Sequence, residues 1–200
     1  MNLTEMRARV REDLQDTDPE NYRWTDDEVD GAIDRVVLEY SAHAPIEQQD
    51  DIATTDGADE LDISSLTGLV KIESVEFPIG ERPKHLQHIE YWAGHLYMQD
   101  EGDGSKARVR WMKKHTLTAD ATTIPAHHEE VIVLGATGYL AMSASANTVD
   151  RAFIAGRFGT QSYRQWGTDR LKRYDFKLRE ISRMNRIIQR NLYSEESEDD

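Results

Sequence analysis

The side chains with the clearest chemical potential in this 200-residue chain are carboxylates near the N-terminus. Asp16, Asp18 and Glu20 alternate like the ligands of a calcium-binding loop. Asp27 holds the twelfth position, but Asn21 stands where such a loop needs glycine. The pattern therefore indicates a connection between two helices rather than a calcium site.

The seven histidines do not follow a metal-binding pattern, because no two are spaced i, i+4 beside a glutamate base. We expect them to be exposed polar side chains. They are His43, His85, His88, His95, His115, His127 and His128.

Other catalytic and cofactor signatures are also missing from the sequence. There is no cysteine, no Gly-x-Ser-x-Gly sequence and no glycine-rich phosphate loop. We therefore expect no catalytic residue, metal or cofactor, and a protein that is not an enzyme. A hydrolase that uses His85 or His128 with nearby carboxylates is the third-ranked hypothesis.

Charge is distributed very unevenly along the chain, whose net charge is −14. Residues 1–60 carry 5 basic and 18 acidic side chains, whereas residues 151–193 carry 11 basic and 3 acidic ones. This distribution favours docking of the basic segment on an acidic protein surface. The alternative is a cellular DNA-binding or regulatory protein that uses these arginines on phosphates, although such proteins are usually basic overall. No apolar run approaches the roughly 20 residues that span a bilayer, so we expect no membrane contact.

Two helices are predicted within residues 1–45. The first runs from Leu3 to Leu14 and begins with Asn2 three residues before Glu5, a capping pair. The second follows the capping box of Thr25 and Glu28 and ends before Pro45. Joined by a short loop, they should pack antiparallel.

Residues 46–123 change to a strand-like pattern and predict one small antiparallel sheet inserted between the helices. Trp92 and Trp111 are expected to be core aromatics of this sheet or anchors of an interface. Turns are expected at residues 93–94 and 101–104. The predicted strands are residues 69–77, with a bulge, 87–91, 95–98 and 106–112.

The remaining helices complete a mainly α chain with an inserted sheet, an α+β helical bundle with a long C-terminal helix. A buried helix is expected from Pro125 to about 146, with Gly135 and Gly138 allowing close packing. The last helix is expected at about 162–193. Residues 1–45 and 124–193 together are predicted to form one helical body, which an acidic tail follows at 194–200. In the last helix the predicted apolar seam lies on one side. It comprises Leu171, Tyr174, Leu178, Ile181, Ile188 and Leu192, interrupted by Asn185.

The order of several short motifs resembles the head-to-tail adaptor proteins, also called neck or head-completion connector proteins, of tailed bacteriophages and related archaeal tailed viruses. Individually these motifs are weak, and their order along most of the chain carries the resemblance. They are residues 3–11 (LTEMRARVR), Trp24-Thr25-Asp26-Asp27-Glu28-Val29, Ile124-Pro125 with His128-Glu129-Glu130, Gly135-Ala136-Thr137-Gly138-Tyr139, Tyr163-x-x-Trp166-Gly167-x-x-Arg170-Leu171, Arg183-x-Asn185-Arg186 and Arg190-x-Leu192-Tyr193.

The resemblance implies a structural protein of the virion neck, between capsid and tail, that is present in the host cytoplasm during assembly. It implies a ring of twelve copies under the portal protein, which extends the DNA channel and supports a stopper or tail-completion protein. Genomic DNA would pass without sequence-specific binding. The strong net charge predicts a monomer or weak oligomer until a portal gathers the copies.

The basic face of the last helix is the candidate portal-docking element. The candidate residues are Arg179, Arg183, Arg186, Arg190, Ile188, Leu192 and Tyr193.

Overall fold

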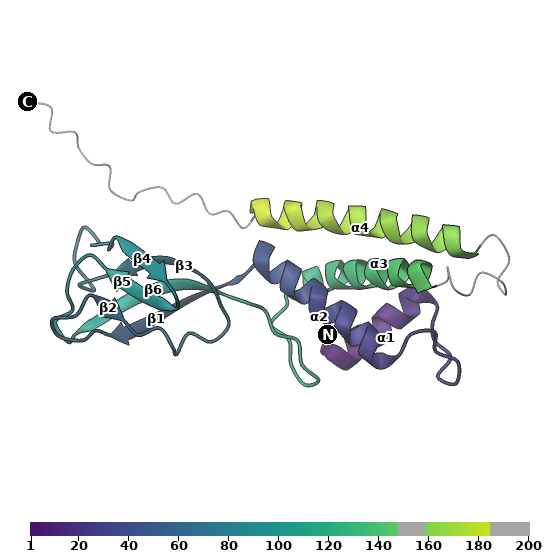
Figure 1. The fold of residues 1–200 in the computed structure, drawn as a ribbon, viewed down its shortest axis with the longest axis horizontal. Coiled ribbons are helices and arrows are strands. Elements are labelled where there is room, and N and C mark those ends of the chain that lie inside the picture. The colour runs from purple at the N-terminus through teal and green to yellow at the C-terminus, as the bar shows by residue number, and fades with distance from the viewer. Residues whose placement is uncertain (148–158, 185–200) are drawn as a thin grey trace, which may run out of the picture. The chain divides into compact units, whose positions relative to one another are not determined.

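The computed structural model describes residues 1–147 and 159–184, which form a mixed α+β protein (Figure 1). The described residues divide into two compact units. Among the described residues, the helical unit comprises Met1–Ala44 and those between His115 and Met184, and the β unit comprises Pro45–Lys114. Residues 115–123, which the sequence pattern assigned to the inserted sheet, thus belong with the helices.

Helices α1 (Leu3–Leu14) and α2 (Asp26–His43) both begin with capping boxes, which confirms the two predicted starts. The Glu5 amide donates to the Asn2 side chain over 2.9 Å, and the Glu28 amide donates to the Thr25 hydroxyl over 3.2 Å. These bonds satisfy backbone donors that the first helical turn leaves without partners.

The connection between α1 and α2 is organised by a buried cation. Arg11 donates from Nη1 to Asp16 over 2.7 Å and from Nη2 to the Trp24 carbonyl over 3.0 Å. The other Asp16 oxygen accepts the Arg23 amide over 2.7 Å. Both Asp16 oxygens therefore accept hydrogen bonds from groups of the same chain. This agrees with the inter-helix loop that the sequence indicates.

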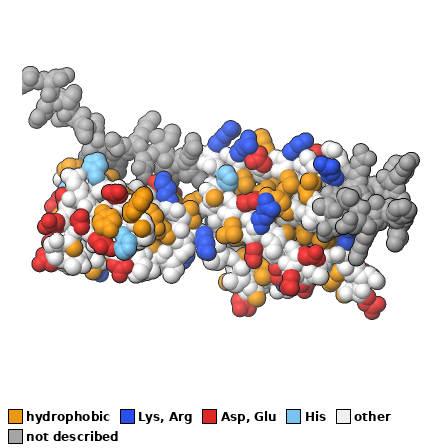
Figure 2. Space-filling view, viewed as in Figure 1, with side chains coloured by type: hydrophobic (Ala, Val, Ile, Leu, Met, Phe, Trp, Pro, Cys, Tyr) orange, Lys and Arg blue, Asp and Glu red, His pale blue; other side chains and the backbone are white. Residues whose placement is uncertain are grey.

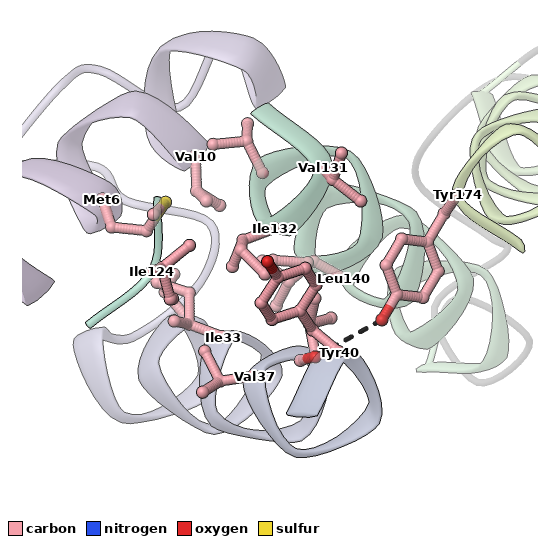
Figure 3. Packing of buried hydrophobic residues seen from close by; sticks show 14 of the residues in the cluster. Met6, Val10, Ile33, Val37, Tyr40, Ile124, Val131, Ile132, Leu140 and Tyr174 are labelled. Atoms are coloured by element: carbon pink, nitrogen blue, oxygen red, sulfur yellow. Dashed lines mark hydrogen bonds between the residues drawn. The ribbon is translucent and has the colours of Figure 1, made fainter. Parts of the chain in front are cut away.

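A short 3₁₀ turn, η1 (Ala126–His128), leads into α3 (Glu129–Asn147), and α4 (Gly159–Met184) is the long C-terminal helix. Helix α3 lies in the middle of the helical core, with Ile132 and Leu140 buried (Figure 3). A Cβ atom at Gly135 would lie 2.9 Å from Val36, and one at Gly138 would lie 2.9 Å from Leu171. These contacts confirm the predicted close packing at both glycines.

The β unit contains two three-stranded antiparallel sheets rather than the single predicted sheet. Both sheets contribute to one apolar core, for example through Val109 and Leu96. Backbone hydrogen bonds also connect the end of β3 with the segment before β4, including Gln87 N–H to Val75 C=O at 2.8 Å. The sheets are β1 (Ile46–Ala53), β6 (Lys106–Lys113) and β3 (Leu69–Glu76) in that order, and β2 (Glu60–Leu61), β5 (His95–Met98) and β4 (Ile89–Trp92).

Two details of the predicted sheet require correction, and one is confirmed. The largely polar strand β1 was not predicted, because it lacks an apolar alternation. Residues 101–104 do not form a hairpin, since β5 and β6 lie in different sheets. The predicted bulge in β3 is present as register shifts near Lys71 and Ser74.

Candidate functional site: the outer face of the last helix

One side of α4 packs into the helical core. Tyr174, Leu178 and Ile181 are buried there, and Leu171 packs against the same cluster. The Tyr174 hydroxyl donates to the Val36 carbonyl of α2 over 3.4 Å, and burial raises the pKa of this phenol above its ordinary value (Figure 3). The described part of the predicted seam therefore holds α4 on its own chain.

The opposite side of α4 exposes cations around an aromatic ring. Phe176 is 66% exposed, and positions three, four and seven residues from it carry Lys172, Arg173, Arg179 and Arg183. Figure 2 shows cationic side chains along the edge of the molecule where α4 runs in Figure 1. We call Lys172, Arg173, Phe176, Arg179, Arg183 and the exposed Met184 the outer face of α4.

Some cations near this face are paired within the helix, and others are not. Arg179 lies 2.8 Å from Asp175, and Lys177 lies 3.0 Å from Glu180. Arg173 and Arg183 make no ion pair with any acid in residues 1–147 or 159–184. These two guanidinium groups can therefore donate to carboxylates of a partner without breaking an ion pair to any described residue.

Arg170, although part of the same basic segment, serves the fold. Its Nη2 donates to Asp13 of α1 over 2.8 Å, and its Nη1 lies 3.3 Å from the Thr137 hydroxyl of α3. Its guanidinium carbon lies 4.3 Å from the centre of the Trp166 ring. Arg170 thus ties α4 to two other helices and is not a docking residue.

Two of the predicted docking residues lie on this face, which also includes two exposed apolar side chains that the sequence analysis did not name. Arg179 and Arg183 are exposed on α4 as predicted. Phe176 and Met184 were not predicted from the sequence. Each is a large apolar residue outside the predicted seam, and this position was the signal that could have identified it. Arg186, Ile188, Arg190, Leu192 and Tyr193 lie outside the described residues.

The two tryptophans named from the β pattern have different environments. Trp111 is buried in the β core, where its Nε1 donates to Asp50 over 2.7 Å. It is therefore a core aromatic and not an interface anchor. Trp92, at the end of β4, is 72% exposed and stays a candidate for contact with another molecule.

Two histidines are structural rather than exposed, which corrects the sequence-based expectation. His115 is buried, with Nε2 2.8 Å from the Ala44 carbonyl. His128 Nδ1 lies 2.6 Å from the Tyr40 hydroxyl. Burial lowers the pKa of His128 and raises the pKa of Tyr40 to about 12, so a neutral phenol donates to a neutral imidazole. The group ties the end of α2 to the segment that enters α3.

A pocket of about 300 Å³ lies between the end of α1 and the start of α4. Its only charged lining side chain among the described residues is Asp13, which already accepts a hydrogen bond from Arg170 and forms an ion pair with it. Within the described residues, no three metal-ligating side chains gather at one place. The pocket lining is Asp13, Leu14, Gln15, Tyr163 and Trp166.

No protein-family model matches the chain, and no curated protein matches its sequence. Within residues 1–147 and 159–184, no helix is long and apolar enough to cross a membrane.

Proposed function

We propose that this protein is a structural adaptor of a tailed virus, which docks under the portal protein and extends the DNA channel as a ring. In this proposal about twelve copies form the ring, which also supports a stopper or tail-completion protein in the virion neck. The observation that carries the proposal is the outer face of α4, where an exposed apolar ring lies among cations.

The composition of this face supports docking on an acidic protein. Aromatic side chains that become buried at the centre of an interface dominate binding energy, and charged residues at the rim steer association. Phe176 has the central position, and Arg173 and Arg183 lack intrachain acids in the described residues. Portal carboxylates would supply the missing partners.

The same face is poorly suited to the alternative role in nucleic-acid binding. Asp169 approaches Lys172 of this face, and Asp175 approaches Arg179. Glu180 approaches the neighbouring Lys177. These acids neutralise cations that phosphate binding needs. An interleaved arrangement of both signs favours a protein partner over DNA.

The body behind the face supports a rigid protomer. We infer that α1 to α4 form the helical bundle of the adaptor, since residues from all four helices contribute to one core. Arg170 further connects α4 to α1 and α3. A docking helix held in this way loses little conformational entropy on binding.

The proposal requires a portal gene in the genomic neighbourhood of this chain, and it is tested with the portal protein that this gene encodes. The variant R173E/R183E, alone and with F176A, should fold normally and fail to co-sediment with portal-bearing heads, which would then leak DNA. The control R82E/K106E makes the same charge change at exposed residues of the β unit. Wild-type binding by R173E/R183E with F176A, or absence of a portal gene from the genome neighbourhood, would refute the proposal.

The assembly state of the isolated protein gives a second test. A net charge of −14 opposes self-association, so light scattering of the pure protein should give a monomer or weak oligomer. The ring should form only when portal is added. A stable ring of twelve copies without portal would contradict the templated assembly.

A further inference from the structure

The solvent-facing side of the sheet β2-β5-β4 gathers aromatic and acidic side chains. Leu61, Leu96 and Met98 point into the β core. Because side chains alternate along a strand, their neighbours point outward, and the strand register places these neighbours side by side. We call this set, which comprises Glu60, Glu90, Trp92, His95 and Tyr97, the acidic–aromatic face.

Trp92 is presented to solvent by the hairpin that joins β4 and β5. It is paired with His95 across a two-residue turn, in which Ala93 and Gly94 have φ of 51° and 90°. Such a turn matches the twist of the strands and holds the residues on either side of it in register. The indole is 72% exposed, although a side chain of this size normally gains stability by burial.

Two carboxylates share this face with Trp92, and one of them makes no ion pair with any described residue. Glu90 lies opposite Tyr97 and makes no ion pair with any described residue. Glu60 lies on the other side of Tyr97 and contacts the His95 imidazole. Asp62, just beyond β2, has a lowered pKa, chiefly because it accepts the Ser64 amide, and so carries its charge at neutral pH.

We propose that the acidic–aromatic face binds an arginine-bearing segment of a second protein. A guanidinium is planar, so it can stack on the Trp92 ring while its N–H groups pair with Glu90. A lysine ammonium supplies charge but lacks this planar fit. A second copy of this chain is a poorer occupant, because each copy carries a net charge of −14.

The acidic–aromatic face is separate from the proposed portal contact. It would bind a basic segment rather than an acidic surface, and it lies on the β unit rather than on the helical unit. It does not depend on the portal contact, since the test below uses the isolated full-length protein. Failure of either proposal would therefore leave the other unaffected.

The experiment titrates ¹⁵N-labelled protein with blocked five-residue peptides of alternating glycine and arginine. Matched peptides carry lysine, or citrulline as the neutral isostere of arginine. The indole N–H signal of Trp92, assigned with the variant W92F, should shift with the arginine peptide, less with lysine and not with citrulline. The Trp111 signal should stay unchanged, which reports an intact β core.

Variants decide whether the face itself binds the peptide. E60Q/E90Q should weaken arginine-peptide binding about fivefold, and W92A should abolish it, whereas E81Q changes an exposed acid elsewhere in the β unit and should have no effect. Equal binding of arginine and citrulline peptides, or unchanged binding by E60Q/E90Q, would overturn the proposal. If the Trp92 signal shifts with protein concentration in the absence of peptide, the face binds a second copy of this chain. That result would also overturn the proposal.

Discussion

Arg11 and Asp16 form an ion pair inside the protein, with Nη1 and Oδ2 2.7 Å apart and each side chain only 6% exposed. The pair connects the last turn of α1 with the loop that leads to α2. Arg11 also reaches the Trp24 carbonyl and the Asp26 carboxylate. Contacts of a buried charged side chain, rather than of an apolar one, thus connect α1 with the loop and with the start of α2.

Removal of Arg11 should destabilise the helical unit strongly. The variant R11A leaves Asp16 buried without its cation, and we expect the free energy of unfolding to fall by about 3–5 kcal/mol. Urea unfolding followed by circular dichroism measures the change. The exposed Arg9 on the same helix pairs with Glu12 and Glu130, and R9A should leave the unfolding midpoint almost unchanged. Equal effects of the two variants would contradict the structural role of Arg11.

The packing of α3 predicts opposite effects for two glycine-to-alanine changes. At Gly135 the new methyl group would press on Val36 and Tyr174, and G135A should destabilise by about 1–3 kcal/mol. At Gly31 of α2 nothing lies within 4 Å, and G31A should stabilise by up to about 1 kcal/mol through helix propensity. Thermal unfolding of both variants compares them directly. A stable G135A would mean that α2 and α4 lie farther from α3.

His128 predicts a loss of stability in mild acid. Burial lowers its pKa in the folded protein below the ordinary value of 6.5, so the unfolded chain binds the proton more readily. Its contribution is complete above about pH 6.5 and decreases as the pH falls from there towards the lowered pKa. The unfolding free energy of H128Q should therefore fall less than that of the wild type between pH 7.5 and 5.5. Parallel pH profiles would rule out His128 as the source.

The two-unit organisation predicts where the β unit can be removed. Replacing residues 46–114 with a flexible linker should preserve the helical circular dichroism, because the helical core uses no side chain from that range. A longer deletion, 46–123, also removes His115, whose amide donates to Ser41 and whose ring contacts the Ala44 carbonyl. That variant should lose helical signal at a lower temperature. Collapse of both variants would show that the β unit is needed for helix folding.

Local sequence signals were sufficient for the helices of this protein. Asn2 and Thr25 act on amides only three residues away, so the two helix starts can be read from a few neighbouring residues. The seam through Tyr174 and Leu178 depends on helical periodicity alone, and the structure buries both residues. Likewise, the basic character of α4 is a property of its composition.

The tertiary structure decided the features that depend on distant partners. The polar strand β1 exists because β6, more than 50 residues later, supplies its hydrogen bonds, and no local pattern encodes that pairing. Arg11 and His115 are buried because partners from other segments satisfy their polar atoms, which composition cannot reveal. For the same reason Phe176 and Met184 were recognised as docking candidates only in the folded structure, whereas Arg179, Arg183 and Trp92 were already candidates from the sequence. Phe176 and Trp92 are large apolar side chains that remain exposed. Which apolar side chains are buried depends on the packing of the whole chain, so their exposure could not be read from the local sequence.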